Sequence, residues 1–208
     1  MAYDLEEQEQ LDELKAWWKR NGSLVQGLLI AALLAFAGWK GWEYYQQKQA
    51  LEASAKYELL SQTDGKDLKN IQSLSGQLME NYAGTPYAAR AALVVAKANF
   101  AANDAKSAKA QLEWARAHAK EESVAAIAQL QLASIQLGEK EYDAALKTLE
   151  GKVTAGFEGL FADLKGDILA AQGKTAEAKA AYTDALTKLA ADGRYRRFTE
   201  RKLDALGS

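Results

Sequence analysis

Charged and apolar residues are distributed unevenly along this chain, and the contrast is strongest in its first fifty residues. Residues 21–39 form a run of nineteen positions without a charged side chain. As an α-helix, this run spans roughly 28 Å at about 1.5 Å per residue, close to the hydrocarbon thickness of a bilayer. Amphipathic aromatic rings, which favour the headgroup layer, flank it on both sides. The pattern therefore predicts a transmembrane helix with aromatic belts made by Trp17, Trp18, Trp39, Trp42, Tyr44 and Tyr45.

Two other structures share part of this pattern. One is a cleaved signal peptide, since Ala35-Phe36-Ala37 has the small-x-small form of a cleavage site. However, the preceding tail is acidic and the apolar run is longer than the usual signal core. The other is a buried core helix, for which aromatic belts at both ends are not expected. The sequence favours a membrane anchor over both.

Positive charge around the run indicates the orientation of this anchor. Lys15, Lys19 and Arg20 precede the run, whereas Lys40 and Lys48 follow it. This slight excess favours an N-terminus in the cytoplasm. The chain has no cysteine, which fits the oxidising space outside a bacterial inner membrane and fits a cytosolic protein equally well. We expect a single-pass inner-membrane protein with a periplasmic C-terminal part.

Small residues recur at every fourth position inside the run. Gly27, Ala31 and Ala35 share one helix face, and Gln26 lies beside them. Such a face lets a second transmembrane helix approach closely, and an amide can form a hydrogen bond across the contact. Glycine and alanine are also common in membrane helices generally, so their abundance alone explains this spacing equally well. The four residues form a candidate partner face.

After the anchor the composition becomes nearly neutral, with 22 Lys and Arg against 21 Asp and Glu from Gln46 onward. Abundant alanine and a single proline predict an all-α fold. Turn signals divide this part into helices, among them a Thr85 N-cap followed by Pro86. The expected organisation is an acidic cytoplasmic tail over residues 1–20, a transmembrane helix over 21–42, a helical stalk and turn over 43–66, and a helical domain over 67–208.

The helices of this domain carry an internal repeat. Gly166, Gly173, Ala178, Tyr182 and Ala185 have the spacing of the tetratricopeptide signature, in which small residues lie where paired helices touch. Matching positions lie 33 residues earlier, with Lys140 at the turn glycine, and a further 37 residues earlier, with Asn103 near the turn. Alanine-rich hairpins produce some such matches by composition alone, and the closing proline is absent. A short α-solenoid of tetratricopeptide-like helix pairs remains the better interpretation. The matching residues are Tyr142, Ala145 and Leu149 in the middle copy and Ala108, Leu112 and Ala115 in the first copy.

A solenoid of this kind has a groove lined by the first helix of each pair. The candidate residues for protein binding there run from basic to acidic along the stack, although polar residues on helices are commonly just solvated. The only basic cluster lies near the C-terminus, at residues 194–202. We expect it to cap the solenoid with Phe198, Leu203 and Leu206 inward and its charges outward, with contact to lipid headgroups or a partner as the alternative. The groove candidates are Arg90, Lys97, Gln131, Ser134, Asp163 and Asp167.

Enzymatic chemistry has little basis in this sequence. The single histidine, His118, is followed by Glu121 and Glu122, but metal sites usually need three or four converging ligands. No nucleophile elbow, phosphate-binding loop or zinc-protease motif is present. The near-neutral domain has no large excess of positive charge that would attract nucleic acid. The sequence therefore predicts a non-enzyme with no catalytic residue, metal, cofactor or nucleic-acid partner.

Several of these features together resemble the ancillary SecYEG translocon subunit family. They are the acidic tail, the single span with its tryptophan collar, the stretch Gly84-Thr85-Pro86-Tyr87-Ala88, and the stretch from Leu164 to Lys174. The resemblance covers essentially the whole chain. It implies an inner-membrane protein with a periplasmic tetratricopeptide-like domain, and no established catalytic residue carries over.

The resemblance also implies partners. Family members associate with the SecYEG channel and with the membrane-anchored periplasmic chaperone PpiD, and they assist newly translocated proteins. We expect these three partners and membrane lipid for this chain. Two other functions remain open at this point: a scaffold for cell-envelope or cell-wall assembly, and a membrane-bound hydrolase with an unrecognised site.

Overall fold

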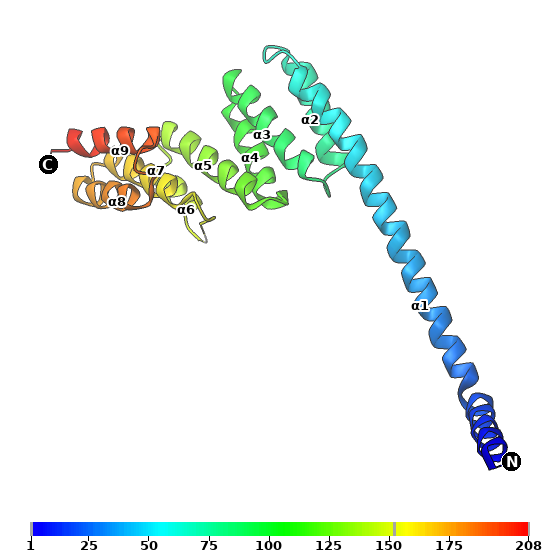
Figure 1. Ribbon diagram of the computed structural model, residues 1–208. Coiled ribbons are helices and arrows are strands. Elements are labelled where there is room, and N and C mark those ends of the chain that lie inside the picture. The colour runs from blue at the N-terminus through cyan, green and yellow to red at the C-terminus, as the bar shows by residue number, and fades with distance from the viewer. Residues whose placement is uncertain (1, 152, 208) are drawn as a thin grey trace. The chain divides into compact units, whose positions relative to one another are not determined.

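The computed structural model describes residues 2–151 and 153–207, with side chains from residue 7 onward, so part of the predicted acidic tail lies outside it. Over these residues the chain forms nine α-helices and no strand (Figure 1), which confirms the all-α fold class. The helices are α1 (Ala2–Gln62), α2 (Leu68–Asn81), α3 (Pro86–Ala101), α4 (Ala105–His118), α5 (Glu122–Gly138), α6 (Tyr142–Thr148), α7 (Glu158–Ala171), α8 (Thr175–Lys188) and α9 (Arg194–Ala205).

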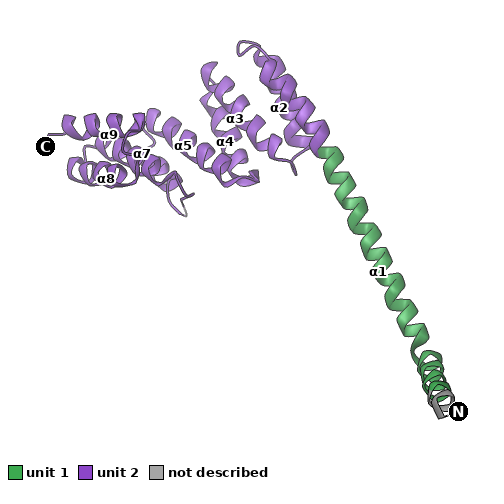
Figure 2. Cartoon of the chain, viewed as in Figure 1, with its two compact units in different colours: residues 1–49 green, residues 50–208 purple. Residues whose placement is uncertain are grey.

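The chain divides into two compact units, residues 1–49 and residues 50–208 (Figure 2). The first unit consists of the larger part of α1. It is the one helix among the described residues that is long and apolar enough to cross a membrane. Its apolar side chains are exposed, with Leu33 at 67% and Leu34 at 69%. The segment therefore does not pack in a core of this chain, which rules out the buried-helix interpretation.

The second unit is a stack of helix pairs whose first member is the end of α1. Ala53 and Leu60 of α1 are buried and pack with Ile71 and Leu78 of α2. The pairs α3–α4, α5–α6 and α7–α8 follow, and α9 packs after them. The last turns of α1 thus belong to the core of this unit, which begins at Ala50, inside the segment predicted as a stalk.

Alanine sets the spacing between the helices of the stack. Ala92 and Ala96 of α3 are buried against Ala108 and Ala115 of α4, each at most 1% exposed. A methyl group takes little space, so the helix axes approach closely along these rows. Larger side chains such as Leu112 fill the gaps that remain. The alanine-rich composition therefore follows from close packing of neighbouring helices.

The turns inside three of the pairs have the same backbone geometry. Asn103, Lys140 and Gly173 all adopt the left-handed conformation, with φ of 63°, 63° and 77°. After each of them, the next backbone N–H donates to the carbonyl five residues earlier, at 2.9, 2.8 and 2.9 Å. This is the bond that closes a helix C-terminus in the Schellman motif. The same turn geometry thus recurs in all three pairs, although only the last has glycine at the left-handed position.

Lys140→Gly is expected to raise the free energy of unfolding by about 0.5–1 kcal/mol. A lysine in the left-handed region costs about 1–2 kcal/mol, part of which is offset by the greater flexibility of unfolded glycine. Urea unfolding of the detergent-solubilised chain, followed by far-UV circular dichroism, measures the change. Gly173→Ala is the matched control, because it should lower stability at the equivalent position. A destabilised Lys140→Gly variant would contradict the argument.

One local prediction is confirmed and another is wrong. Thr85 and Pro86 hold the predicted N-cap and first helical positions of α3, although the Thr85 hydroxyl donates to the Tyr82 carbonyl at 2.8 Å and makes no capping bond. Phe198 was expected inside the C-terminal cap and is 46% exposed. Thr199, at 1% exposure, takes the inward position, because its hydroxyl has a carboxylate partner on α7.

Candidate functional site

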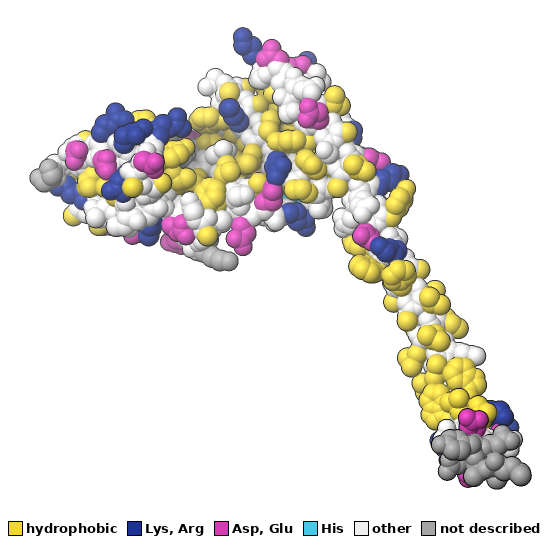
Figure 3. Space-filling view, viewed as in Figure 1, with side chains coloured by type: hydrophobic (Ala, Val, Ile, Leu, Met, Phe, Trp, Pro, Cys, Tyr) yellow, Lys and Arg dark blue, Asp and Glu magenta, His cyan; other side chains and the backbone are white. Residues whose placement is uncertain are grey.

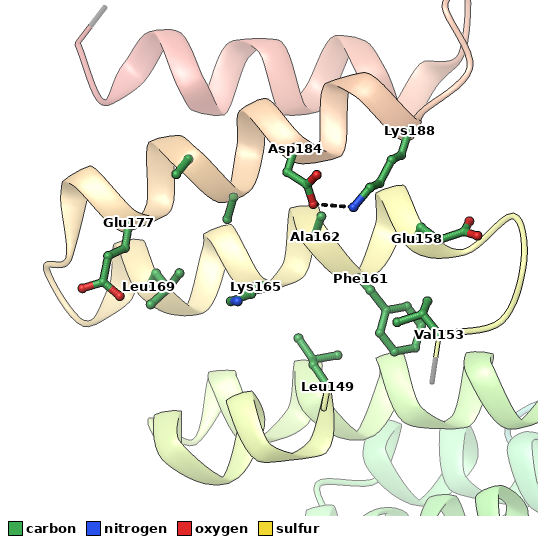
Figure 4. Close-up of a pocket in the computed structure, with 12 residues that line it drawn as sticks. Leu149, Val153, Glu158, Phe161, Ala162, Lys165, Leu169, Glu177, Asp184 and Lys188 are labelled. Atoms are coloured by element: carbon green, nitrogen blue, oxygen red, sulfur yellow. Dashed lines mark hydrogen bonds and ion pairs between the residues drawn. The ribbon is translucent and has the colours of Figure 1, made fainter. Parts of the chain in front are cut away.

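The second helix of the third pair is half as long as its counterparts, and this difference opens a cleft. Helix α6 has seven residues, whereas α4 and α8 have 14 each. Residues 149–151 and 153–157 belong to no helix, and Gly151 and Gly156 have φ of 103° and 84°. Beside this segment, parts of the surfaces of α7 and α8 are open to solvent. They form a cleft of about 520 Å³ (Figure 4).

The floor of this cleft is apolar and its rim is charged. In Figure 4, Leu149 and Val153 face Phe161 at one side, and Lys165 and Glu177 lie farther along the cleft. An ion pair of 2.6 Å between Lys188 and Asp184 bounds the edge. An open apolar trough with a charged border is suited to the apolar side of a polypeptide segment. The remaining lining residues are Glu158, Ala162, Leu169, Ala180 and Ala181.

A second cleft, of about 410 Å³, lies between α2, α3 and α4 and is more polar. Asn99 on its wall is 3% exposed and accepts a hydrogen bond from the Gln72 amide at 2.8 Å. Trp114 also lines it and stacks on His118 with ring centroids 4.2 Å apart. Side-chain amides beside an aromatic surface can bind peptide groups.

The six groove candidates do not gather into one polar cluster. Lys97, Gln131 and Ser134 are exposed on α3 and α5, and the Ser134 hydroxyl donates to the Leu130 carbonyl within its own helix. Arg90 donates two hydrogen bonds to Glu121, at 2.7 and 2.8 Å. These bonds raise the pKa of Arg90 and lower that of Glu121.

Asp163 and Asp167 are instead joined to the last two helices. Lys202 of α9 lies 2.8 Å from Asp163 and 2.7 Å from Asp167. Thr199 donates to Asp163, and the Tyr182 hydroxyl of α8 donates to Asp167. Burial alone would lower the pKa of Lys202, but the bonds to both carboxylates outweigh it and raise that pKa. Burial and the bond to Asp167 raise the pKa of Tyr182. These carboxylates therefore hold α7, α8 and α9 together.

The repeat-packing residues lie at the contact of α7 and α8. Ala178 and Ala185 are fully buried, and Tyr182 is 3% exposed. A Cβ added at Gly166 would lie 2.5 Å from the Tyr182 ring, so glycine alone leaves room for it. Gly173 forms the turn between the two helices.

The candidate membrane face lies on the exposed part of α1, within the first unit. Gly27, Ala31, Ala35 and Gln26 are all exposed. A Cβ added at Gly27 would meet no other atom within 4 Å. The face is therefore accessible from outside the helix, and its role stays a prediction.

Comparisons with known proteins agree with this architecture. Residues 15–208 match the model of a family described as a tetratricopeptide repeat-like domain. The chain is 34% identical to the ancillary SecYEG translocon subunit of Neisseria gonorrhoeae, over 99% of this chain and 100% of the relative. The chain belongs to the ancillary SecYEG translocon subunit family. Proteins of the same name in Haemophilus influenzae and Escherichia coli K12 are 31% and 30% identical, over 89% and 85% of this chain and 91% and 85% of the relatives.

Membership in the ancillary SecYEG translocon subunit family confirms the resemblance drawn from the sequence motifs. A family of this name with a tetratricopeptide-like domain is not typically enzymatic. Among the described residues, no group of three or more His, Cys, Asp or Glu is arranged to hold a metal ion. The Nδ1 atom of His118 lies 2.9 Å from the Trp114 carbonyl, so this ring is engaged within its own helix.

Sequence reasoning missed the cleft over α7 and α8. Its signal was present in Gly151, which has a positive φ at the position equivalent to Asp184, where the second helix of the next pair continues. Glycine with positive φ is incompatible with a continuing helix. A comparison of helix lengths between the repeats would therefore have located the opening, although not its depth or lining.

Proposed function

We propose that this protein is a non-enzymatic inner-membrane subunit that associates with the Sec channel and binds polypeptide with its helix-pair unit. Three findings support this: the name that its relatives share, the exposed apolar helix of the first unit, and the tetratricopeptide-like second unit. The N-terminus lies in the cytoplasm and the second unit in the periplasm. Its partners there are newly translocated proteins and the membrane-anchored chaperone PpiD.

The observation that carries the binding role is the open cleft at the shortened α6. Its lining is mainly apolar and open to solvent, so the cleft can bind the apolar side of an amphipathic segment. Anchoring beside the channel raises the local concentration of this site, so modest affinity suffices for emerging chains.

Site-specific photo-crosslinking in cells tests the proposal. A crosslinker at Lys165, on the cleft rim, is expected to capture newly translocated chains or PpiD, and one at Gly27 the Sec channel. Ala180→Glu places a carboxylate on the apolar wall and should lower capture from Lys165 about tenfold, or ~1.4 kcal/mol. Ala110→Glu, an exposed change on α4, is the matched control and should leave capture intact.

The second candidate function, a scaffold for cell-envelope or cell-wall assembly, gives a different result. Such a scaffold would be crosslinked only to envelope-assembly proteins, from both positions. That outcome, or capture from Lys165 that Ala180→Glu does not change, contradicts the proposed role.

A further inference from the structure

The C-terminal helix α9 has two unlike faces. Its inner face holds Thr199 and Lys202, which bond to α7, and Leu203 and Leu206, which pack beside the buried Tyr182. These contacts hold the helix on the end of the stack without using its other side. The inner face therefore holds α9 in place while its outer face stays exposed to solvent.

The outer face combines arginine with aromatic rings. At about 100° per residue, Arg194, Arg197, Phe198 and Arg201 fall within about 100° of one another around the helix. Phe198 is 46% exposed, and Tyr195 in the first turn of the helix is 53% exposed. The Arg201 guanidinium lies 4.7 Å from the centre of the Phe198 ring. Figure 3 shows the resulting cluster of basic side chains over α9.

The charge of this face is largely uncompensated. Within residues 2–151 and 153–207, no ion pair joins Arg194, Arg197 or Arg201 to a carboxylate. Glu200 pairs with Arg196 at 3.0 Å, and Asp204 lies at the edge of the face. Arg197 and Arg201 instead donate to the backbone carbonyls of Asp192 and Arg197, at 3.5 and 3.3 Å, and Arg194 lies 5.7 Å from the centre of the Tyr195 ring. The face therefore offers positive charge to an external anion.

We propose that the outer face of α9 binds the surface of an anionic lipid bilayer. Guanidinium groups pair with lipid phosphates, and partly exposed aromatic rings enter the headgroup layer. Positive charge on the helix complements the negative charge of such lipids. Neither cleft described above is lined by the three arginines or by Phe198. A protruding helix face of this kind suits a fluid surface, which needs no matching shape, better than it suits an acidic protein segment.

The predicted membrane span lies close in the chain to the start of the second unit. Seven residues separate the end of the predicted span, Trp42, from the second unit, which begins at Ala50. A link of that length spans about 10 Å as a helix. The second unit therefore remains close to the membrane, and even a weak surface contact gains from the high local concentration of lipid.

A fluorescent label on the outer face tests this contact in the full chain. The protein has no cysteine, so Ala205→Cys, at an exposed position about one turn after Arg201 on the same side of the helix, gives a single attachment site for an environment-sensitive dye. The labelled protein is reconstituted in nanodiscs of phosphatidylcholine, with or without phosphatidylglycerol. Emission is expected to rise severalfold only with the anionic lipid and to return to the neutral-disc level in high salt.

Matched charge variants decide the outcome. Replacement of Arg194, Arg197 and Arg201 by Gln should abolish the rise. Replacement of the exposed Lys106, Arg116 and Lys120 by Gln removes the same charge elsewhere and should preserve it. Circular dichroism checks that both variants are folded. Equal emission in the two discs, or equal loss in the two variants, overturns the proposal.

An acidic polypeptide is the competing ligand class. If poly-glutamate raises emission in detergent while the anionic disc does not, the face binds acidic protein and the lipid proposal is wrong. Capture of the Sec channel from Gly27 is measured separately. The failure of the lipid contact therefore leaves the proposed function standing, and the failure of that capture leaves the lipid contact standing.

Discussion

Gly166→Ala is expected to destabilise the second unit by about 2 kcal/mol. The new methyl group would lie 2.5 Å from two ring carbons of Tyr182. This ring cannot move aside easily, because it is 3% exposed and its hydroxyl is bonded to Asp167 at 2.8 Å. Overpacking of a core costs about 1–3 kcal/mol, and the gain in helix propensity from glycine to alanine, about 1 kcal/mol, offsets only part of it. Urea unfolding of the full chain in detergent measures the loss.

A double-mutant cycle shows whether Tyr182 is the cause. Tyr182→Ala alone should cost about 3–4 kcal/mol by leaving a cavity. Gly166→Ala should then add no further loss, because the atoms it would meet are gone. Gly76→Ala in α2 is the matched control, since a Cβ there meets nothing within 4 Å, and it should stabilise the chain. Additive losses in the cycle would show that Gly166 acts through something other than this ring.

Lys202→Ala is expected to lower the free energy of unfolding by about 2 kcal/mol and to loosen α9. Removal of the ammonium group leaves Asp163 and Asp167 close together without their counter-ion. Breaking a buried pair costs about 3–5 kcal/mol, but Lys202 is 35% exposed and solvent screening reduces this figure. Hydrogen exchange of α9 amides locates the effect. Asn at both carboxylate positions should restore most of the stability, because Asn keeps acceptors for Thr199 and Tyr182.

The Lys202 ammonium group also makes the free energy of unfolding depend on pH in the alkaline range. The two carboxylates raise the pKa of Lys202 above its ordinary 10.5, so the folded chain holds this proton more tightly than the unfolded chain. The contribution of Lys202 is therefore complete below pH 10.5 and is lost as the pH rises through the higher folded value. The urea midpoint should fall more steeply above pH 10 in the parent chain than in Lys202→Met. Equal slopes would mean that the bonds contribute nothing to stability.

Much of the fold could be predicted from local patterns in the sequence. The uncharged run with its aromatic ends predicted a helix of membrane-spanning length, because the distribution of charge along one helix needs no tertiary information. Turn residues located the ends of most helices, since Thr85-Pro86 and the residues around Gly173 act on their own backbone. The repeat spacing led to Asn103 and Lys140, and the structure shows that both adopt the turn geometry of Gly173.

The bonding partners of the groove candidates could not be predicted from such local patterns. Asp163 and Asp167 lie on the first helix of their pair, where a binding residue is expected. Nothing near them in the sequence indicates that Lys202, more than thirty residues later, bonds to both. The partner of a charged side chain depends on which distant helix packs beside it. Periodicity shows that a position faces outward from its own helix, but it does not show what lies opposite.

The sequence by itself determined the helical character, the membrane-compatible segment and the repeat unit, because each follows from propensity and burial within one or two neighbouring helices. The tertiary structure alone decided three other features. It placed the end of α1 in the core of the second unit, opened the cleft beside α6, and turned Phe198 outward on α9. Each of these depends on which surfaces meet in the folded stack. The contacts of residues distant in the chain determine those surfaces, and the order of residues within one helix does not reveal them.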